Sequence, residues 1–126
     1  MADELILIVD DNDKNVKLAR DVLRFAGFRT LEAGTAAEGI SLAVEHLPDL
    51  VLMDIRLPDL NGTVAVHRLK EDGRTARIPV VALTSFAMMG DRERFLAEGF
   101  DGYLEKPISV REFPAQVRSH LVANER

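Results

Sequence analysis

Short apolar runs alternate along this chain with longer stretches in which apolar residues recur at helical spacing. The first run, Leu5–Val9, is apolar throughout, as expected for a strand that is buried on both faces of a sheet. Further strand-length runs cover residues 28–32, 50–53, 78–83 and 102–105, and helical stretches lie near residues 16–26, 36–46, 63–71, 90–98 and 109–122. Strands that alternate with helices form a parallel sheet with right-handed crossovers. The sequence therefore predicts an α/β fold, a single doubly wound five-stranded parallel sheet with five helices.

Composition excludes several classes of function. The 126 residues suit one domain, and 16 basic against 21 acidic side chains leave a net charge of −5. A mildly acidic chain without a polybasic stretch is a poor candidate for binding nucleic acid or an anionic membrane. Cysteine is absent, which excludes disulfides, thiolate metal sites and thiol nucleophiles. With no signal sequence or apolar span of about 20 residues, the expected location is the cytoplasm.

Polar residues follow four of the five predicted strands. In open α/β sheets, ligands bind outside the carboxyl ends of the strands, so these residues are expected to share one edge. The second strand is followed by nothing chemically distinctive. The residues at the other four strand ends offer three carboxylates, two hydroxyls and one ammonium, from Asp10, Asp11, Asp54, Thr84, Ser85 and Lys106.

Such a cluster has an electrostatic problem. Two carboxylates about 4 Å apart repel by roughly 4 kcal/mol at an effective dielectric constant near 20, and one lysine cannot balance three of them. Either some carboxylates are protonated or a cation lies among them. Mg²⁺ prefers oxygen ligands and uses only a few protein carboxylates. A metal-bound carboxylate beside a lysine and a hydroxyl is also what phosphoryl transfer requires.

Other chemistries find little support in the sequence. The chain has no phosphate-binding G-x-x-x-x-G-K-[ST] run, no G-x-G-x-x-G after its first strand and no G-x-S-x-G nucleophile turn. His46, His67 and His120 all fall in predicted helices, away from the acidic edge. They therefore suggest neither a metal site nor a catalytic triad.

Structural roles are the alternative explanation for the same residues. Asp10 and Asp11 could lead into the first helix, but Asn12 or Asp13 is better placed to cap it. Thr84 could likewise be an ordinary cap residue.

The start of the last helix is ambiguous. Ser109 and Glu112 have the spacing of a capping box, but Pro114 would then remove a backbone hydrogen bond beyond the first turn. Either the first turn is distorted or the regular helix starts later. The predicted apolar stripe of this helix is Val110, Phe113, Val117 and Leu121.

Four segments stand out because they occur together and in this order along the chain. They are Ile8–Asn12, Leu52–Pro58 with Asn61-Gly62, Ala82–Ser85 and Tyr103–Pro107. Together they resemble the receiver domain of two-component response regulators, in the CheY-like superfamily. The similarity covers essentially the whole chain, and the pattern is closest to single-domain DivK-like regulators. The resemblance implies strand order 2-1-3-4-5 and one receiver domain over residues 1–126, with no output domain.

The resemblance also implies a role for each polar residue. Asp54 would accept a phosphoryl group from a phosphohistidine on a sensor histidine kinase. Mg²⁺ would be held by Asp10, Asp11, Asp54 and the backbone carbonyl of Arg56. Lys106 would pair with the phosphoryl group, and its bond to the following proline would be cis.

A conformational switch is part of the same expectation. Thr84 would donate its hydroxyl to a phosphoryl oxygen, and Tyr103 would move inward in response. Ser85 stands where receivers usually have alanine but is still small, so access to the acceptor should survive. Arg56 and Phe86 are large residues at positions that tune the lifetime of the acyl phosphate, which suggests a fairly stable phosphoryl group.

The implied output is a protein contact on the fourth helix, fifth strand and fifth helix, or transfer of the phosphoryl group to a histidine phosphotransfer protein. We expect a monomer or weak dimer that is not an enzyme beyond weak autophosphatase activity.

One alternative is a small Mg²⁺-dependent phosphatase of the haloacid-dehalogenase type. Such enzymes need a second aspartate two residues after the nucleophile, where this chain has Arg56 or Asn12. A phosphate-independent binding module is a third reading, against which the intact acidic set argues.

Overall fold

The computed structural model describes residues 3–85 and 91–124. Strands and helices alternate throughout, as the sequence predicts, and the strands form one sheet. The elements are β1 (Leu5–Val9), α1 (Asp13–Phe25), β2 (Arg29–Ala33), α2 (Ala36–His46), β3 (Leu50–Asp54), α3 (Gly62–Glu71), β4 (Val80–Thr84), α4 (Asp91–Ala97), β5 (Gly102–Glu105) and α5 (Phe113–Asn124). No helix in the described ranges is long and apolar enough to span a bilayer.

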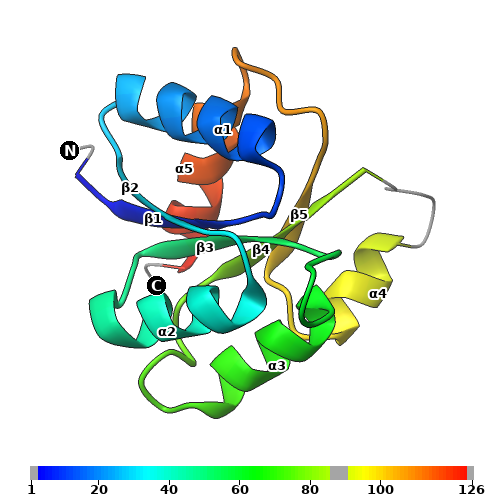
Figure 1. Ribbon diagram of the computed structural model, residues 1–126. Helices are drawn as coiled ribbons and strands as arrows, with labels where there is room; N and C mark the ends of the chain where they lie inside the picture. Colours follow the sequence, from blue (N-terminus) through cyan, green and yellow to red (C-terminus); the bar gives the residue numbers. More distant parts are fainter. Residues whose placement is uncertain (1–2, 86–90, 125–126) are drawn as a thin grey trace.

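The sheet has the strand order β2-β1-β3-β4-β5, and every neighbouring pair is parallel. Helices α1 and α5 cover one face, and α2, α3 and α4 cover the other (Figure 1). This arrangement confirms the predicted doubly wound fold. Because β1, β3, β4 and β5 lie side by side, the residues that follow them emerge along one edge.

Continuous apolar strands arise because each strand serves two cores. Leu7, Val51 and Ala82 point into the cluster beneath α2, α3 and α4. The neighbouring Ile8, Leu52 and Val81 belong to the cluster beneath α1 and α5 instead. Since side chains alternate across a strand, both cores are filled only if consecutive residues are apolar.

Side-chain caps start three of the helices. Asn12 Oδ1 accepts hydrogen bonds from the backbone N–H groups of Lys14 and Asn15, at 3.0 and 3.1 Å. Thr35 caps α2 and Asn61 caps α3 in the same way. Because Asn12 caps α1, the two aspartates before it are not needed for capping, as the sequence suggested.

The last helix begins later than the Ser109 start considered from the sequence. The Glu112 N–H donates to Ser109 Oγ at 3.3 Å, but regular α5 starts at Phe113. Pro114 is therefore the second residue of the helix, where the missing N–H has no helical partner to lose. The predicted apolar stripe is wrong for Val110, which precedes the helix and is 61% exposed.

Other element boundaries moved by one to three residues, the largest shift being the start of α1 at Asp13 rather than residue 16. Strand β2 ends at Ala33 rather than Glu32, and α3 starts at Gly62 rather than residue 63. The predicted fourth strand started at residue 78, but Ile78 donates its N–H to Thr75 O at 3.0 Å in a turn, so β4 begins at Val80. The predicted start of the fourth helix, residue 90, lies outside the described residues.

Candidate functional site

Two buried aspartates lie next to each other at the carboxyl edge of the sheet. Strand β3 ends in Asp54, and Asp10 follows β1, whose residue Val9 is in register with Met53. Asp10 is 2% exposed and Asp54 is 8% exposed, whereas the neighbouring Asp11 is exposed. One carboxylate oxygen from each of the three aspartates lies within 4.8 Å of the other two. The structure thus brings the predicted acidic set together.

Lys106 is the cation that faces this cluster. It follows β5, and its backbone N–H donates to Thr84 O at 2.8 Å, which fixes its place beside the end of β4. Its ammonium donates to Asp54 Oδ2 at 3.1 Å and lies 2.9 Å from Asp10 Oδ2. The Lys106–Pro107 peptide bond is cis, as predicted. A single lysine is therefore shared by two buried carboxylates.

Backbone donors hold the other oxygen of each buried carboxylate. Asp10 Oδ1 accepts from the Asn12 N–H at 2.9 Å, and Asp54 Oδ1 accepts from the Arg56 N–H at 3.1 Å. Among the described residues, no well-aligned hydrogen bond reaches Asp10 Oδ2, although the Lys106 ammonium is close. This buried oxygen retains the capacity to coordinate a cation.

Burial and charge shift the pKa values at the site in a consistent way. Burial raises the pKa of Asp54 above its ordinary value, and the charge of Asp10 adds to the rise. The Arg56 N–H and Lys106 lower this pKa but do not cancel the rise. Burial alone would lower the pKa of Lys106, but Asp10 and Asp54 outweigh it and raise that pKa. The site therefore carries more negative charge than its own residues stabilise.

We expect the Asp54→Asn variant to be more stable than wild type at neutral pH in a metal-free buffer. Because folding raises the pKa of Asp54, the ionised carboxylate disfavours the folded state. The stability difference should be small below the unfolded-state pKa of about 3.9 and grow as pH rises through the folded-state pKa. A gain on the order of 1 kcal/mol is expected, because the amide avoids the cost of burying a charged carboxylate beside Asp10, part of which Lys106 offsets. Urea unfolding between about pH 4 and pH 8 measures it, and a pH-independent difference would contradict it.

Thr84 and Tyr103 occupy different parts of this region. Thr84 is buried at the end of β4 and borders a cavity of about 440 Å³ that opens onto the acidic cluster. Tyr103 lies on β5 and borders a separate cavity of about 350 Å³. Its ring packs against Phe95 of α4, with centroids 5.9 Å apart. Phe86, which was expected to tune the lifetime of the acyl phosphate, lies outside the described residues.

The cavity also has a wall that the sequence did not predict. Alongside Asp54, Thr84 and Lys106, it is bordered by Arg94 and Phe95 of α4. No sequence motif distinguishes these two residues, because their place at the cavity depends on how α4 packs against the rest of the fold. The remaining lining residues are Asp11, Asn12, Asn15, Ile55, Arg56 and Ser85.

A second unpredicted contact involves the loop after β3. The Asp59 carboxylate accepts hydrogen bonds from the backbone N–H groups of Ala36 and Ala37, both at 2.9 Å. These donors are at the start of α2, and they lower the pKa of Asp59. The loop that carries Arg56 is thus tied to the start of a neighbouring helix.

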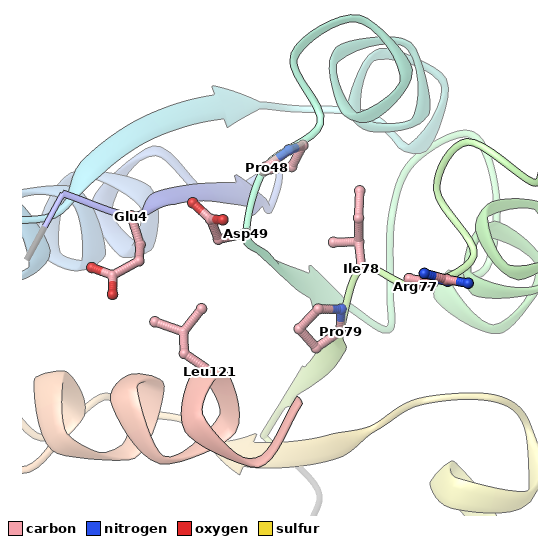
Figure 2. Close-up of a pocket in the computed structure, with 7 residues that line it drawn as sticks. All are labelled: Glu4, Pro48, Asp49, Arg77, Ile78, Pro79 and Leu121. Carbon is pink, nitrogen blue, oxygen red and sulfur yellow. The ribbon is translucent and has the colours of Figure 1, made fainter. Parts of the chain in front are cut away.

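Figure 2 shows another cavity, of about 250 Å³, between residues that precede β1, β3 and β4 and the α5 residue Leu121. It lies at the opposite end of the strands from the aspartate cluster. Its two carboxylates already have partners: Asp49 accepts from the Leu5 N–H at 2.8 Å, and Glu4 lies 3.6 Å from Arg118. The cavity therefore lacks a comparable set of reactive groups.

Comparisons with known proteins find a family that matches most of the chain. Residues 6–118 match the sequence profile of the response regulator receiver domain. The chain is 44% identical over 116 residues to the polar-differentiation response regulator DivK of Brucella anthropi, covering 92% of this chain and 94% of DivK.

Solved structures give the same result. The receiver domain of a sensor histidine kinase from Pseudomonas aeruginosa, with a magnesium ion coordinated in its active-site cleft, superposes with a TM-score of 0.86 at 32% identity, covering 96% of this chain and 99% of that one. A CheY-like receiver domain protein from Methanospirillum hungatei gives a TM-score of 0.87 at 27% identity, covering 98% of each chain. The chain therefore belongs to the response regulator receiver domain family of two-component systems.

Proposed function

We propose that Asp54 accepts a phosphoryl group from a phosphohistidine of a sensor histidine kinase. The observation that carries this proposal is the buried aspartate pair, Asp10 and Asp54, sharing one ammonium beside a 440 Å³ cavity. A carboxylate oxygen of Asp54 attacks phosphorus and forms an acyl phosphate. The phosphorus–nitrogen bond breaks, and the imidazole leaves with the electron pair.

The residues present fit a magnesium ion. Asp10, Asp11, Asp54 and the backbone carbonyl of Arg56 would hold it, and all four offer the oxygen ligands that Mg²⁺ prefers. The support is the 4.8 Å grouping of the carboxylate oxygens and the buried Asp10 Oδ2 without an aligned hydrogen bond. When bound, the ion would supply positive charge to the phosphoryl oxygens.

The Asp11→Ala variant should bind Mg²⁺ at least about tenfold more weakly than wild type, because it loses one carboxylate ligand. Isothermal titration with Mg²⁺ alone measures the affinity. Asp13→Ala is the matched control, since it removes the same charge from a neighbouring exposed residue outside the carboxylate cluster. Equal affinities for wild type and Asp11→Ala would remove Asp11 from the metal set.

The residues around the acceptor then respond to the added charge. Modification adds about −1.5 to −2 charges at the buried edge. Lys106, which already contacts Asp54, would pair with the phosphoryl group, and Thr84 would donate its hydroxyl to a phosphoryl oxygen. Movement of Thr84 leaves room for Tyr103 to turn inward. The surface formed by α4, β5 and α5 would thereby differ between the two states and select partners.

We expect Thr84→Ala to accept phosphate but to lose the response of Tyr103. The chain has one tyrosine and no tryptophan, so its tyrosine fluorescence reports on Tyr103 alone. Acetyl phosphate should change that fluorescence in wild type and in Thr84→Ser, which keeps the hydroxyl. The same phosphorylation stoichiometry without a fluorescence change is expected for Thr84→Ala. A full fluorescence change in Thr84→Ala would contradict the proposal that the Thr84 hydroxyl triggers the movement of Tyr103.

The phosphoryl group would then act through a partner, by changing the affinity of a protein target or by moving on to a histidine phosphotransfer protein. We do not expect catalytic turnover beyond weak autophosphatase activity. Arg56 and Asn12 occupy the positions at which a phosphatase of the haloacid-dehalogenase type would need its second aspartate. Multiple turnovers with small phosphate esters would favour the phosphatase. Phosphotransfer profiling against the histidine kinases of the source organism would identify the donor.

A further inference from the structure

Arg94 stands between two cavities on the α4 side of the acidic edge. One is the 440 Å³ cavity that contains Asp54 and Lys106. The other, of about 290 Å³, is bordered by the start of α3 and by Glu98. Arg94 and Phe95 border both cavities, so the arginine side chain has access to the acidic edge and to the space beside α3.

The position of Arg94 follows from the burial of its neighbour. Phe95 is 2% exposed and packs edge-on against Phe100 and at a tilt against Tyr103, with ring centroids 6.0 and 5.9 Å apart. The guanidinium carbon of Arg94 lies 5.0 Å from the centroid of the Phe95 ring. Helix α4 is therefore anchored by one aromatic residue, and that residue also orients the exposed arginine.

Charge at the acidic edge gives this arginine a role. Phosphorylation replaces the single charge of Asp54 with about two, beside the charges of Asp10 and Asp11. A divalent cation and Lys106 together leave roughly one negative charge for the arginines that border the cavity, Arg56 and Arg94, to offset. An arginine is always charged, and its planar fork matches the oxygens of a phosphoryl group.

We propose that Arg94 is a further phosphoryl-binding residue, whose guanidinium donates hydrogen bonds to the phosphoryl group on Asp54. This inference rests on the proposed phosphorylation of Asp54. In binding the phosphoryl group, the guanidinium moves from its place over the Phe95 ring toward the acidic edge. Because Phe95 contacts Tyr103, the same movement links α4 to the switch residue.

The test is binding of beryllium fluoride, a stable mimic of the phosphoryl group, in saturating Mg²⁺ by isothermal titration. Arg94→Ala should bind it about tenfold more weakly, the expected loss for a charge-assisted hydrogen bond. Arg94→Lys, which keeps the charge without the fork, should lie in between. Arg74→Ala is the matched control, since Arg74 is exposed and paired with Asp72 at 2.7 Å beyond the end of α3. It should bind like wild type.

A titration with Mg²⁺ alone separates phosphoryl binding from general charge. Removing a cation near the carboxylates should leave Mg²⁺ affinity unchanged or higher, so a loss of Mg²⁺ binding in Arg94→Ala would overturn the proposal as a structural defect. Wild-type affinity of Arg94→Ala for beryllium fluoride would also overturn it, while leaving the proposed function intact. Failure of wild type to bind beryllium fluoride at all would instead reject both proposals. Thermal unfolding of every variant verifies that each chain is folded. Arg94→Gln, which removes the charge but keeps a long side chain, is included in the same measurement.

Discussion

The Asp54→Asn variant should take up no phosphoryl group from acetyl phosphate, whereas wild type should be modified once per chain. In the proposed reaction the Asp54 carboxylate is the nucleophile, and a neutral amide of nearly the same shape lacks the electron density to attack phosphorus. The loss should be complete within detection, because among the described residues Asp54 is the buried aspartate that both contacts Lys106 and borders the open cavity. Asp10 shares Lys106 but does not border that cavity. Intact mass spectrometry in saturating Mg²⁺ measures the stoichiometry.

Asp59→Asn provides the control for this experiment. Asp59 is an exposed aspartate on the loop after β3, and its carboxylate accepts hydrogen bonds from the start of α2. The control should be phosphorylated to the same extent as wild type. Retained labelling of Asp54→Asn at full stoichiometry would reject Asp54 as the acceptor, and peptide mapping would then show whether Asp10 had taken its place.

The acidic edge was predictable because it depends on topology. Once the apolar run at residues 50–53 is assigned to a parallel strand, the residue after it must lie at the carboxyl edge. The same argument places Asp10 and Lys106 at that edge, and electrostatics then predicts either a protonated carboxylate or a cation among them. What the sequence could not supply is the direction in which each side chain points, such as the shared contact of Lys106 with two carboxylates.

Contacts that depend on helix packing were not predictable in the same way. Arg94 has no sequence signal, since its place at the cavity follows from the burial of Phe95 between Phe100 and Tyr103. Asp59 is similar, because its bonds to α2 join segments that are far apart along the chain. Local patterns report on strands and helices, whereas these contacts are decided by how loops and helices meet.

The start of α5 shows two local preferences in conflict. Ser109 and Glu112 form half of the expected capping interaction, yet the regular helix waits until Phe113. Pro114 explains the delay, because it is tolerated in a first turn but not deeper in a helix. Periodicity alone extended the apolar stripe back to Val110, although that residue lies on the connection before the helix, outside the core.

The strongest effect on stability is expected for Phe113→Ala, at about 3–5 kcal/mol of lost unfolding free energy. Phe113 is 1% exposed and belongs to the core beneath α1 and α5, so its removal leaves a cavity lined by residues from several elements. Val110→Ala is the matched comparison, because the sequence assigned both residues to one stripe. Exposed at 61%, Val110 should contribute less than about 0.5 kcal/mol.

Urea unfolding of the two variants beside wild type decides between the sequence pattern and the structure. Similar losses for both would mean that Val110 packs into the core. A large loss for Phe113→Ala alone would place Val110 outside the core, on the turn that precedes α5. Because α5 forms part of the proposed partner-binding surface, the same result fixes which of its residues face the core and which remain available to a partner.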